Sequence, residues 1–230
     1  MAKSKVVDAI YIATPNYMHA EQSIICMDHG KHVLCEKPLA SNAREVRSMI
    51  EAAKRNGVTF MEAMISTLNP NFIAAREKMK DIGRIRRYFA SYCQYSSRYD
   101  KFKEGIVLNA FRRELSNGAI MDIGIYTIYP MVALFGMPDS IQAEGVLLSN
   151  GFDGQGAVNF KYDKLDMTAT VLYSKIANSF LPSEIEGEEG TMMIDQIHIA
   201  QNVDFIPRIP TGQGQSQKAV RESLGSPLDK

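Results

Sequence analysis

The stretch HVLCEKP, residues 32–38, is a short apolar run that ends in polar residues and a proline. An earlier apolar run, residues 8–14, leads in the same way into Thr-Pro-Asn. One segment of helix length lies between the two runs. This layout predicts two parallel strands joined by a crossover helix, with both strand ends at one edge of a sheet. Ligands bind at that edge in open α/β sheets, which makes Lys37 a candidate for chemistry.

The first part of the chain alternates between strand-like and helix-like patterns. Strands are predicted at residues 8–14, 31–36 and 58–64, and helices at residues 17–29 and after the capping candidates Ser41 and Asn42. Gly30 and Gly57 follow the two helices, and glycine commonly ends a helix. Strand, helix, strand, helix, strand is the pattern of a doubly wound α/β fold with a parallel sheet.

The pattern changes near residue 65. Helices are expected at residues 71–80 and at residues 119–135, the second interrupted by Pro130 and ended by Gly136. Residues 84–97 are rich in Tyr, Ile and Phe, and further strands are predicted at residues 141–149, 156–162, 167–174, 180–186 and 191–195. Strands joined by tight turns form an antiparallel sheet. We therefore expect a larger, predominantly antiparallel α+β domain with helices on one face.

These patterns divide the chain into two domains and a tail. The first domain is expected over residues 1–65 and the second over residues 66–204. Residues 205–230 are rich in proline and glycine and contain few apolar residues, so a loosely ordered tail is predicted there.

The bulk composition is that of an ordinary globular protein. Its 230 residues are 45% hydrophobic and 23% charged, and 26 basic residues balance 26 acidic ones. This balance predicts no basic surface for nucleic acid. The N-terminus has no apolar signal core, and we find no apolar run that predicts a membrane span. We expect a cytoplasmic protein without a membrane partner.

Cysteine and histidine form no pattern of a disulfide framework or a metal site. Cys26, Cys35 and Cys93 are few and scattered. His29 and His32 flank a helix end without an acidic or cysteine partner at ligand spacing. No metal site is expected.

Four short motifs follow one another along the chain. They are ATPNxxH at residues 13–19, EKP at residues 36–38, NGxxxDIGIY at residues 117–126 and GxxGT at residues 187–191. In this order and spacing they resemble the Gfo/Idh/MocA oxidoreductases, the group that includes glucose–fructose oxidoreductase and dihydrodiol dehydrogenase. The likeness extends over roughly residues 6–200.

The resemblance implies an NAD(P)-dependent enzyme with an N-terminal Rossmann-like domain and a C-terminal antiparallel domain. Such enzymes transfer hydride between the nicotinamide cofactor and a sugar, polyol or cyclic diol. The phosphate-binding glycine loop of the family lies on a strand before the ATPN motif, and we do not find it here. The expectation is a chain truncated at its N-terminus and at its C-terminus, with an incomplete dinucleotide-binding domain over residues 1–65. On its own such a chain would bind dinucleotide weakly.

Hydride transfer from an alcohol needs a group that takes the hydroxyl proton and a donor that stabilises the developing alkoxide. Lys37 fits the second role, because Pro38 fixes the backbone beside it and disfavours helix at Lys37. The alternative interpretation is a solvated surface lysine, which is the common fate of lysine.

Asp122 and Tyr126 are four residues apart in a predicted helix, so they share one face. A carboxylate next to a phenol can hold it in place. The resemblance implies that Tyr126 is the proton donor and acceptor, with Asp122 orienting it. The alternative is a buried tyrosine whose hydroxyl is bonded to a nearby acid for structural reasons.

The resemblance also implies the residues that contact the cofactor, either NAD or NADP. Thr14, Pro15, Asn16 and His19 should line the nicotinamide side of the cleft, with Lys37. Glu36 should reach the nicotinamide ribose. Arg112 should contact the cofactor, because it stands where many family members have the arginine of a Trp-Arg pair that does so. Without the resemblance, Thr-Pro-Asn is an ordinary turn.

Two other functions remain open from the sequence. The chain could be a non-catalytic dimerising fragment, since family members often pair their large sheets face to face and alternation at residues 158–162 leaves one sheet face apolar. It could also bind a sugar without turnover. The expected partners are a small sugar, polyol or diol and a second copy of the chain.

Overall fold

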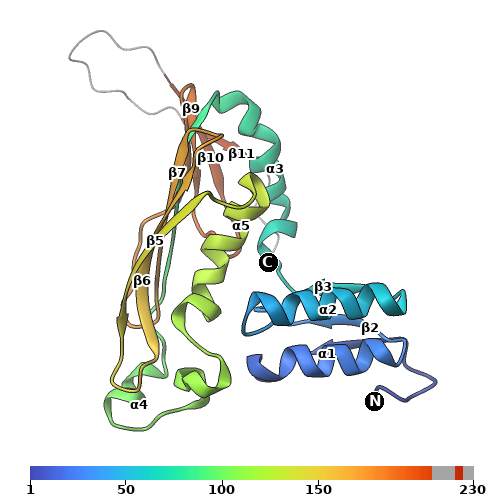
Figure 1. Ribbon diagram of the computed structural model, residues 1–230. Helices are drawn as coiled ribbons and strands as arrows, with labels where there is room; N and C mark the ends of the chain where they lie inside the picture. Colours follow the sequence, from blue (N-terminus) through green and yellow to red (C-terminus); the bar gives the residue numbers. More distant parts are fainter. Residues whose placement is uncertain (209–220, 225–230) are drawn as a thin grey trace.

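The computed structural model describes residues 1–208 and 221–224. The chain folds into a small unit with a parallel sheet and a long unit with a large sheet, which lie side by side (Figure 1). The expected boundary near residue 65 falls in the segment that links them.

The small unit contains a three-stranded parallel sheet in the order β1-β2-β3. Its strands are β1 (Ala9–Ile12), β2 (His32–Cys35) and β3 (Phe60–Glu62). The helices α1 (His19–Asp28) and α2 (Ala43–Asn56) pack together on one face. The alternation of β1 and β2 turns Ile10, Ile12, Val33 and Cys35 into the core beneath these helices.

Local signals place the helices of this unit close to where the sequence predicts them. A 3-10 turn (Asn16–Met18) leads into α1. Asn42, rather than Ser41, caps α2: its side chain accepts a hydrogen bond from the backbone N–H of Glu45 at 3.1 Å. Gly57 ends the helix in a left-handed conformation with φ of 62°.

The other face of the parallel sheet carries apolar side chains without a cover among the described residues. Tyr11, Leu34 and Met61 are exposed on it, and Ile65 and Leu68 extend the same surface. Parallel sheets are usually covered on both faces. This bare face therefore distinguishes the small unit from an ordinary doubly wound sheet.

The large unit is built on an eight-stranded sheet in the order β11-β10-β9-β8-β4-β7-β6-β5. The strands are β4 (Ile85–Cys93), β5 (Ser140–Leu147), β6 (Asp153–Tyr162), β7 (Met167–Ser174), β8 (Ser183–Gly187), β9 (Gly190–Ile194), β10 (Val203–Pro207) and β11 (Glu222–Leu224). All neighbouring strands are antiparallel except β4 and β7, which are parallel. The predicted fold class is confirmed, with this parallel pair as an unforeseen detail.

Helices cover one face of the large sheet (Figure 1). The longer ones are α3 (Pro70–Lys78) and α5 (Ile125–Phe135), while α4 (Tyr99–Lys103) lies in a connecting loop. Short 3-10 turns occur at Ser66–Leu68, Met79–Ile82, Asn109–Phe111 and Arg113–Leu115. The core beneath α5 includes Tyr88, whose hydroxyl donates to the carbonyl of Thr127 at 3.0 Å.

The end of the large sheet differs from the predicted loose tail. Residues 203–207 form β10 and pair with β9, because Val203 and Phe205 alternate inward and bury their side chains in the core. Glu222–Leu224 then adds β11 at the sheet edge. The rest of the predicted tail, apart from residues 208 and 221, lies outside the described residues.

The helical segment Arg113–Phe135 is long and apolar enough to cross a membrane by length and composition alone. The expectation that no run meets this criterion is therefore wrong. In the structure this segment contains the π-helix and α5, which pack against β4 and β7. Its apolar residues are those of a helix that covers a sheet.

Candidate active site

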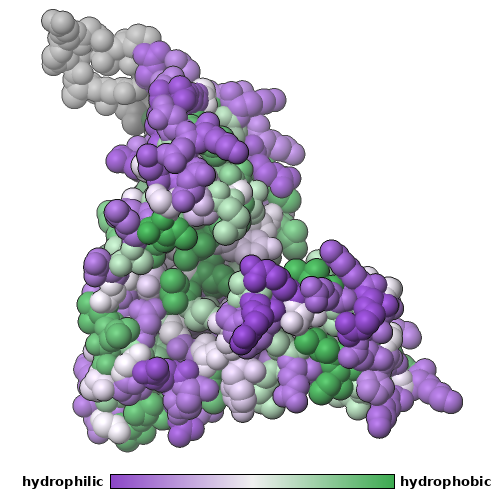
Figure 2. All heavy atoms as spheres, viewed as in Figure 1, coloured by the Kyte–Doolittle hydropathy of each residue, from purple (hydrophilic) through white to green (hydrophobic). Residues whose placement is uncertain are grey.

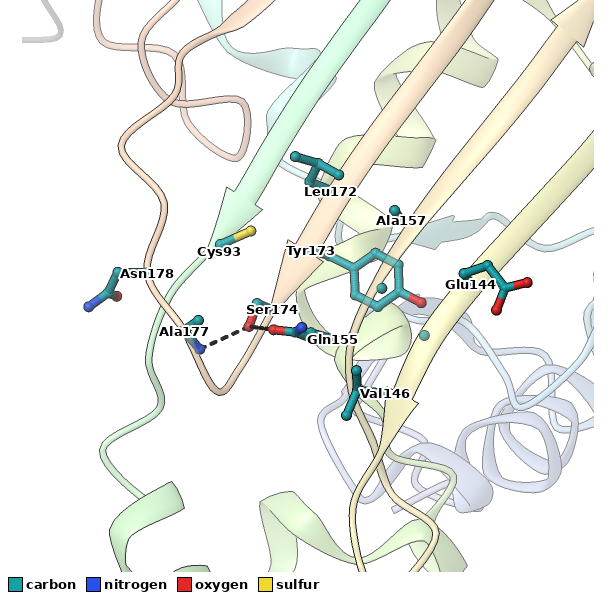
Figure 3. A pocket seen from close by; sticks show the side chains of 12 residues that line it. Cys93, Glu144, Val146, Gln155, Ala157, Leu172, Tyr173, Ser174, Ala177 and Asn178 are labelled. Carbon is teal, nitrogen blue, oxygen red and sulfur yellow. Dashed lines mark hydrogen bonds between the residues drawn. The ribbon is translucent and has the colours of Figure 1, made fainter.

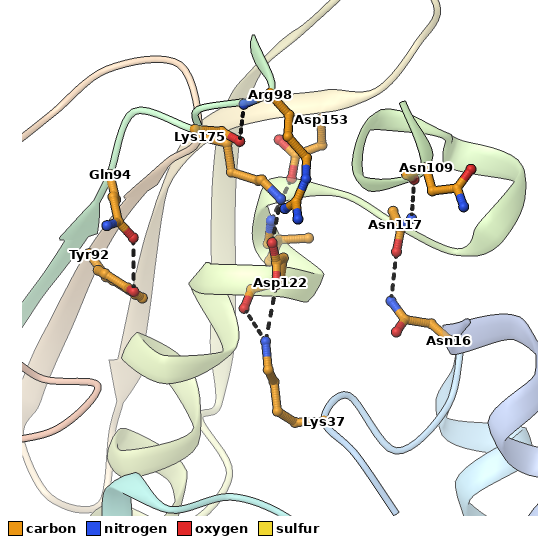
Figure 4. A network of polar contacts seen from close by, with 12 residues as sticks. Asn16, Lys37, Tyr92, Gln94, Arg98, Asn109, Asn117, Asp122, Asp153 and Lys175 are labelled. Carbon is orange, nitrogen blue, oxygen red and sulfur yellow. Dashed lines mark hydrogen bonds and ion pairs between the residues drawn. The ribbon is translucent and has the colours of Figure 1, made fainter. Parts of the chain in front are cut away.

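Lys37 connects the two units of the molecule. It follows β2 and precedes Pro38 across a cis peptide bond. Its Nζ donates to the main-chain oxygen of Asp122 at 2.8 Å and to Oδ1 of the same residue at 3.1 Å (Figure 4). The side chain is only 15% exposed, so the solvated surface lysine is not what the structure has.

Asp122 lies in a π-helix, Ile120–Gly124, that precedes α5. The backbone N–H of Ile125 reaches back to the carbonyl of Ile120, one residue further than in an α-helix. Asp153 anchors the start of the turn, because its Oδ2 accepts from the N–H of Ile120 at 2.8 Å. Gly124 packs on the ring of Tyr173, where a Cβ would come within 3.1 Å of Cγ. The sequence predicted a helix over residues 119–135 with an interruption at Pro130, and it did not predict the π-helix at its start.

A second lysine, Lys175, binds the same carboxylate, and the sequence analysis did not find it. It directly follows β7 and pairs with Oδ2 of Asp122 (Figure 4). Its Nζ also lies 5.4 Å from the ring centroid of Phe111 and 6.0 Å from that of Phe152. A lone lysine after an apolar strand carries no motif, so only the three-dimensional structure reveals it.

The electrostatic balance keeps Asp122 ionised. Burial by itself would raise its pKa. The charges of Lys175 and Lys37, with their hydrogen bonds, outweigh burial and hold the pKa of this carboxyl below its ordinary value. Two ammonium groups face the carboxylate of Asp122, and the carboxyl group of Glu62 also lies near Lys37.

Tyr126 lies in the first turn of α5, on the side that faces Lys37. The Nζ of Lys37 is 4.9 Å from its ring centroid. Tyr92 packs on it edge to face at 5.8 Å, and His198, stacked on Tyr92 at 4.4 Å, also approaches its edge. Burial lowers the pKa of His198. Sequence reasoning missed both of these aromatic neighbours.

The predicted bond between Asp122 and Tyr126 is not formed. Both carboxylate oxygens of Asp122 bind lysines instead. Among the described residues the hydroxyl of Tyr126 has no hydrogen-bond partner, so it is free to meet a ligand. Lys37, rather than Asp122, therefore provides the polar group that contacts the ring of Tyr126.

His19 joins the two strand-end loops from within. It is fully buried, with Nδ1 at 2.9 Å from the carbonyl oxygen of Pro38 and Nε2 at 2.7 Å from that of Thr14. Both nitrogens are occupied by the chain itself. His19 thus fixes the loops that carry Thr14 and Lys37.

The remaining predicted residues after β1 are held by polar contacts. Thr14 donates to Gln22 at 2.8 Å, and Pro15 precedes the first turn of helix. Asn16 donates to the main-chain oxygen of Ser116 at 3.1 Å and to Asn117 at 3.0 Å, in the large unit (Figure 4). Asn16 and Lys37 therefore both cross between the two units.

Glu36 and Arg112 have different surroundings. Glu36 accepts from the hydroxyl of Tyr11 and from the backbone N–H of Lys37. Arg112 is 48% exposed and pairs with Glu114 at 3.2 Å. Within the part of the chain that the structure describes, no hydrogen bond or ion pair joins Arg112 to Lys37 or Asp122.

A separate pocket of about 380 Å³ lies at the end of the large sheet (Figure 3). It is lined by residues of β5, β6 and β7, among them Glu144, Gln155 and Tyr173. None of Lys37, Asp122 and Tyr126 is in its lining, so it is not part of the candidate site. Burial raises the pKa of Tyr173 to about 12.

The residues at the ends of β1 and β2 fit the nicotinamide end of a dinucleotide, because they present polar side chains at the ligand edge of a parallel sheet. A pyrophosphate is usually held by a glycine-rich turn before a helix. The described strand-to-helix segments at residues 13–15, 36–42 and 63–69 contain no glycine. Searched over the described ranges, His, Cys, Asp and Glu form no group of three or more that could hold a metal.

Two family models match the chain. Residues 1–64 match a model described as an oxidoreductase family with an NAD-binding Rossmann fold, and residues 72–193 match the GFO/IDH/MocA C-terminal domain. Together the matches cover both units of the structure.

Curated relatives and solved structures agree with these matches. The chain is 55% identical over 205 residues to scyllo-inositol 2-dehydrogenase (NADP(+)) of Bacillus subtilis, covering 89% of this chain and 62% of that protein. It is 30% identical over 204 residues to trans-1,2-dihydrobenzene-1,2-diol dehydrogenase of Danio rerio, covering 84% of this chain and 57% of that protein. A levoglucosan dehydrogenase solved with NADH and levoglucosan superposes with a TM-score of 0.81 at 23% identity, and the match covers 96% of this chain and 62% of that protein. The chain thus spans less than two thirds of the length of each of these proteins.

Proposed function

Because this chain belongs to the Gfo/Idh/MocA family of oxidoreductases, we propose that it supplies the substrate-binding and proton-transfer part of an NAD(P)-dependent dehydrogenase. The single observation that carries this proposal is the meeting of Lys37 from one unit with Asp122 and the ring of Tyr126 from the other. These groups provide a hydrogen-bond donor, its charged anchor and an unoccupied phenol at one place.

The proposed reaction oxidises a secondary alcohol to a ketone. NAD(P)⁺, when bound at the ends of β1 and β2, supplies the hydride acceptor. The ammonium of Lys37 donates a hydrogen bond to the alcohol oxygen and stabilises its developing negative charge. The oxygen of Tyr126, in its phenolate form, takes the hydroxyl proton and becomes the phenol, which returns the proton in the reverse direction. Asp122 holds Lys37 in place.

The residues proposed to contact the cofactor are those at the two strand ends. Thr14, Pro15 and Asn16 would line the nicotinamide side and Glu36 would reach the ribose. His19 acts by fixing the loops, since both of its ring nitrogens face backbone carbonyls. Arg112 remains a weaker candidate because it pairs with Glu114. No glycine turn for a pyrophosphate is present in the described strand-to-helix segments, so we expect weak cofactor binding.

The proposed substrate is a polyol of the inositol type. The named activity of the relative that is 55% identical supports this choice. The name of the diol dehydrogenase relative supports a wider class of cyclic diols and sugars. We place the reaction in the cytoplasm, and we leave the preference between NAD and NADP to measurement.

The test is reduction of NADP⁺ or NAD⁺ by the chain in the presence of scyllo-inositol, other polyols, sugars and a cyclic trans-diol. We expect polyol-dependent reduction that requires high cofactor concentrations. Tyr126→Phe should lower the turnover number on the order of a hundredfold or more. Tyr162→Phe is the matched control, because its hydroxyl bonds to the carbonyl of Gly136 at 3.0 Å instead of facing the site. The proposal would be contradicted if the chain neither bound nor oxidised any of these compounds.

A second candidate function is polyol binding without turnover. The ammonium of Lys37 and the hydroxyl of Tyr126 support it, because these two groups can bind a polyol whether or not a cofactor is held. Saturation-transfer NMR with scyllo-inositol separates the candidates: a bound polyol with no reduction of either cofactor supports binding alone.

We further infer that a second copy of the chain covers the outer face of the large sheet. All residues of the edge strand β5 are exposed, and Val146, opposite Gln155, lies on the outer face. The apolar side of the alternation at residues 158–162 is buried beneath the helices instead, so it does not contribute to this face. Figure 2 shows apolar residues on the visible side of the large sheet toward its lower end. We expect a dimer by light scattering that Val146→Glu weakens. A strict monomer at high concentration would contradict this inference.

A further inference from the structure

We propose that Lys175 is a positioning residue: it is the permanent partner of Asp122 and holds that carboxylate charged and in place while Lys37 moves between Asp122 and the substrate oxygen. This inference rests on the proposed function. It assigns a role to a buried charge that neither the motifs nor the relatives' names point to.

The backbone fixes Lys175 on both sides. Its N–H donates to the carbonyl of Gly154 at 2.9 Å, and its own carbonyl accepts from the N–H of Ser96 at 2.9 Å. These bonds tie the residue to the start of β6 and to the segment after β4. Asp122 lies in the same unit, so Lys175 and Asp122 move together.

The surroundings of the ammonium exclude water. The Lys175 side chain is 6% exposed, and the nearby rings of Phe111 and Phe152 are fully buried. Aromatic faces stabilise a cation, while the loss of water makes an unpaired buried charge costly. Asp122 is the carboxylate that pairs with Lys175 in the described residues, so separating the two is unfavourable.

Lys37 differs from Lys175 in its exposure and in the unit that carries it. Its side chain is 15% exposed, and it reaches Asp122 from the other unit. Each lysine uses a different carboxylate oxygen, Oδ1 for Lys37 and Oδ2 for Lys175. Lys37 can therefore turn toward a ligand without leaving Asp122 unpaired.

The charge count gives this arrangement a chemical consequence. With Lys37 alone, Asp122 would neutralise the charge that must stabilise the alkoxide. With Lys175 also present, the charge of Asp122 is balanced without Lys37, and the buried carboxyl of Glu62 is a further acidic group near Lys37.

The first test is the carboxyl carbon shift of Asp122 followed against pH by NMR, assigned with Asp122→Asn. We expect Lys175→Met to raise the midpoint of protonation by about one pH unit, a tenfold change in proton affinity, and by more than Lys37→Met does. Lys175→Arg should restore the wild-type midpoint, and Lys164→Met, at an exposed lysine, should leave it unchanged. An unchanged midpoint in Lys175→Met would overturn the proposal.

Activity gives the second test and separates this inference from the proposed function. In the polyol assay Lys175→Met should lower kcat on the order of a hundredfold with KM little changed, while Lys175→Arg recovers most of the rate. If no polyol is oxidised, the proposed function fails, and the NMR titration still decides whether Lys175 holds Asp122.

A folding defect in Lys175→Met would not end the test. The Lys175 ammonium of the wild-type chain should then give a nitrogen–proton signal protected from exchange with water, which Asp122→Asn abolishes. A rapidly exchanging Lys175 ammonium in the folded wild-type chain would overturn the proposal.

Discussion

The parallel sheet is covered on one face by α1 and α2, and no described residue covers its opposite face, whereas the large sheet carries a continuous core beneath α3 and α5. The two units also contribute differently to the site. The large unit builds the buried pair of Asp122 and Lys175 from its own sheet and π-helix. The small unit adds Lys37 on a loop that reaches across. We conclude that the large unit provides the fixed charge and the small unit the movable one.

The largest expected effect is on the core of the large unit. Tyr88→Ala removes a fully buried ring and should lower the free energy of unfolding by about 4 kcal/mol. Urea unfolding combined with hydrogen exchange measures the loss in each unit. We expect the protected amides of β4 and β7 to lose protection, while those of β1 and β2 keep theirs. Equal losses in both sheets would show that the units unfold as one.

The next expected effect is an opposite response of the two units to acid. The pKa of Asp122 lies below its ordinary value of 3.8, so its stabilising contribution is present above pH 3.8 and is lost as the pH falls further. Burial raises the pKa of Glu62, at the end of β3, above 4.5. The contribution of Glu62 is therefore complete below pH 4.5 and is lost as the pH rises through the raised pKa.

Stability curves for Asp122→Asn and Glu62→Gln against pH measure this contrast. The stability advantage of the wild-type chain over Asp122→Asn should shrink in acid. The stability of the wild-type chain relative to Glu62→Gln should increase in acid. Two curves of the same slope would contradict the different electrostatic environments of the two carboxyl groups.

The smallest expected effect is at Arg112. Its exposed pair with Glu114 should contribute less than about 0.5 kcal/mol to stability, so Arg112→Ala should unfold with the wild-type curve. Titration with NADPH and NADH tests its predicted cofactor role at the same time. Unchanged cofactor binding would remove Arg112 from the proposed contacts and leave those at the ends of β1 and β2.

The sequence predicts the parts of this molecule that depend on local patterns. The alternating residues of β1 and β2 and the caps at Asn42 and Gly57 define the small unit. The strand-end position of Lys37 and the four-residue spacing of Asp122 and Tyr126 are local signals too, whereas a common site for these three residues is what the family resemblance implied.

Features set by distant residues could not be predicted in this way. Lys175 is buried because Phe111 and Phe152, from other segments, close around it. The π-helix depends on Asp153, which is 33 positions from Ile120. The alternation in β10 is too short to predict a strand, and the segment forms one because it pairs with β9.

The bare face of the parallel sheet has a consequence for how the protein behaves in solution. Tyr11, Leu34 and Met61 present a contiguous apolar surface that a fluorescent dye for hydrophobic sites should find in the native state. Molecules that associate through such a face stabilise one another by mass action. The apparent Tm of the small unit should therefore rise with protein concentration, even though no residue in its core has changed.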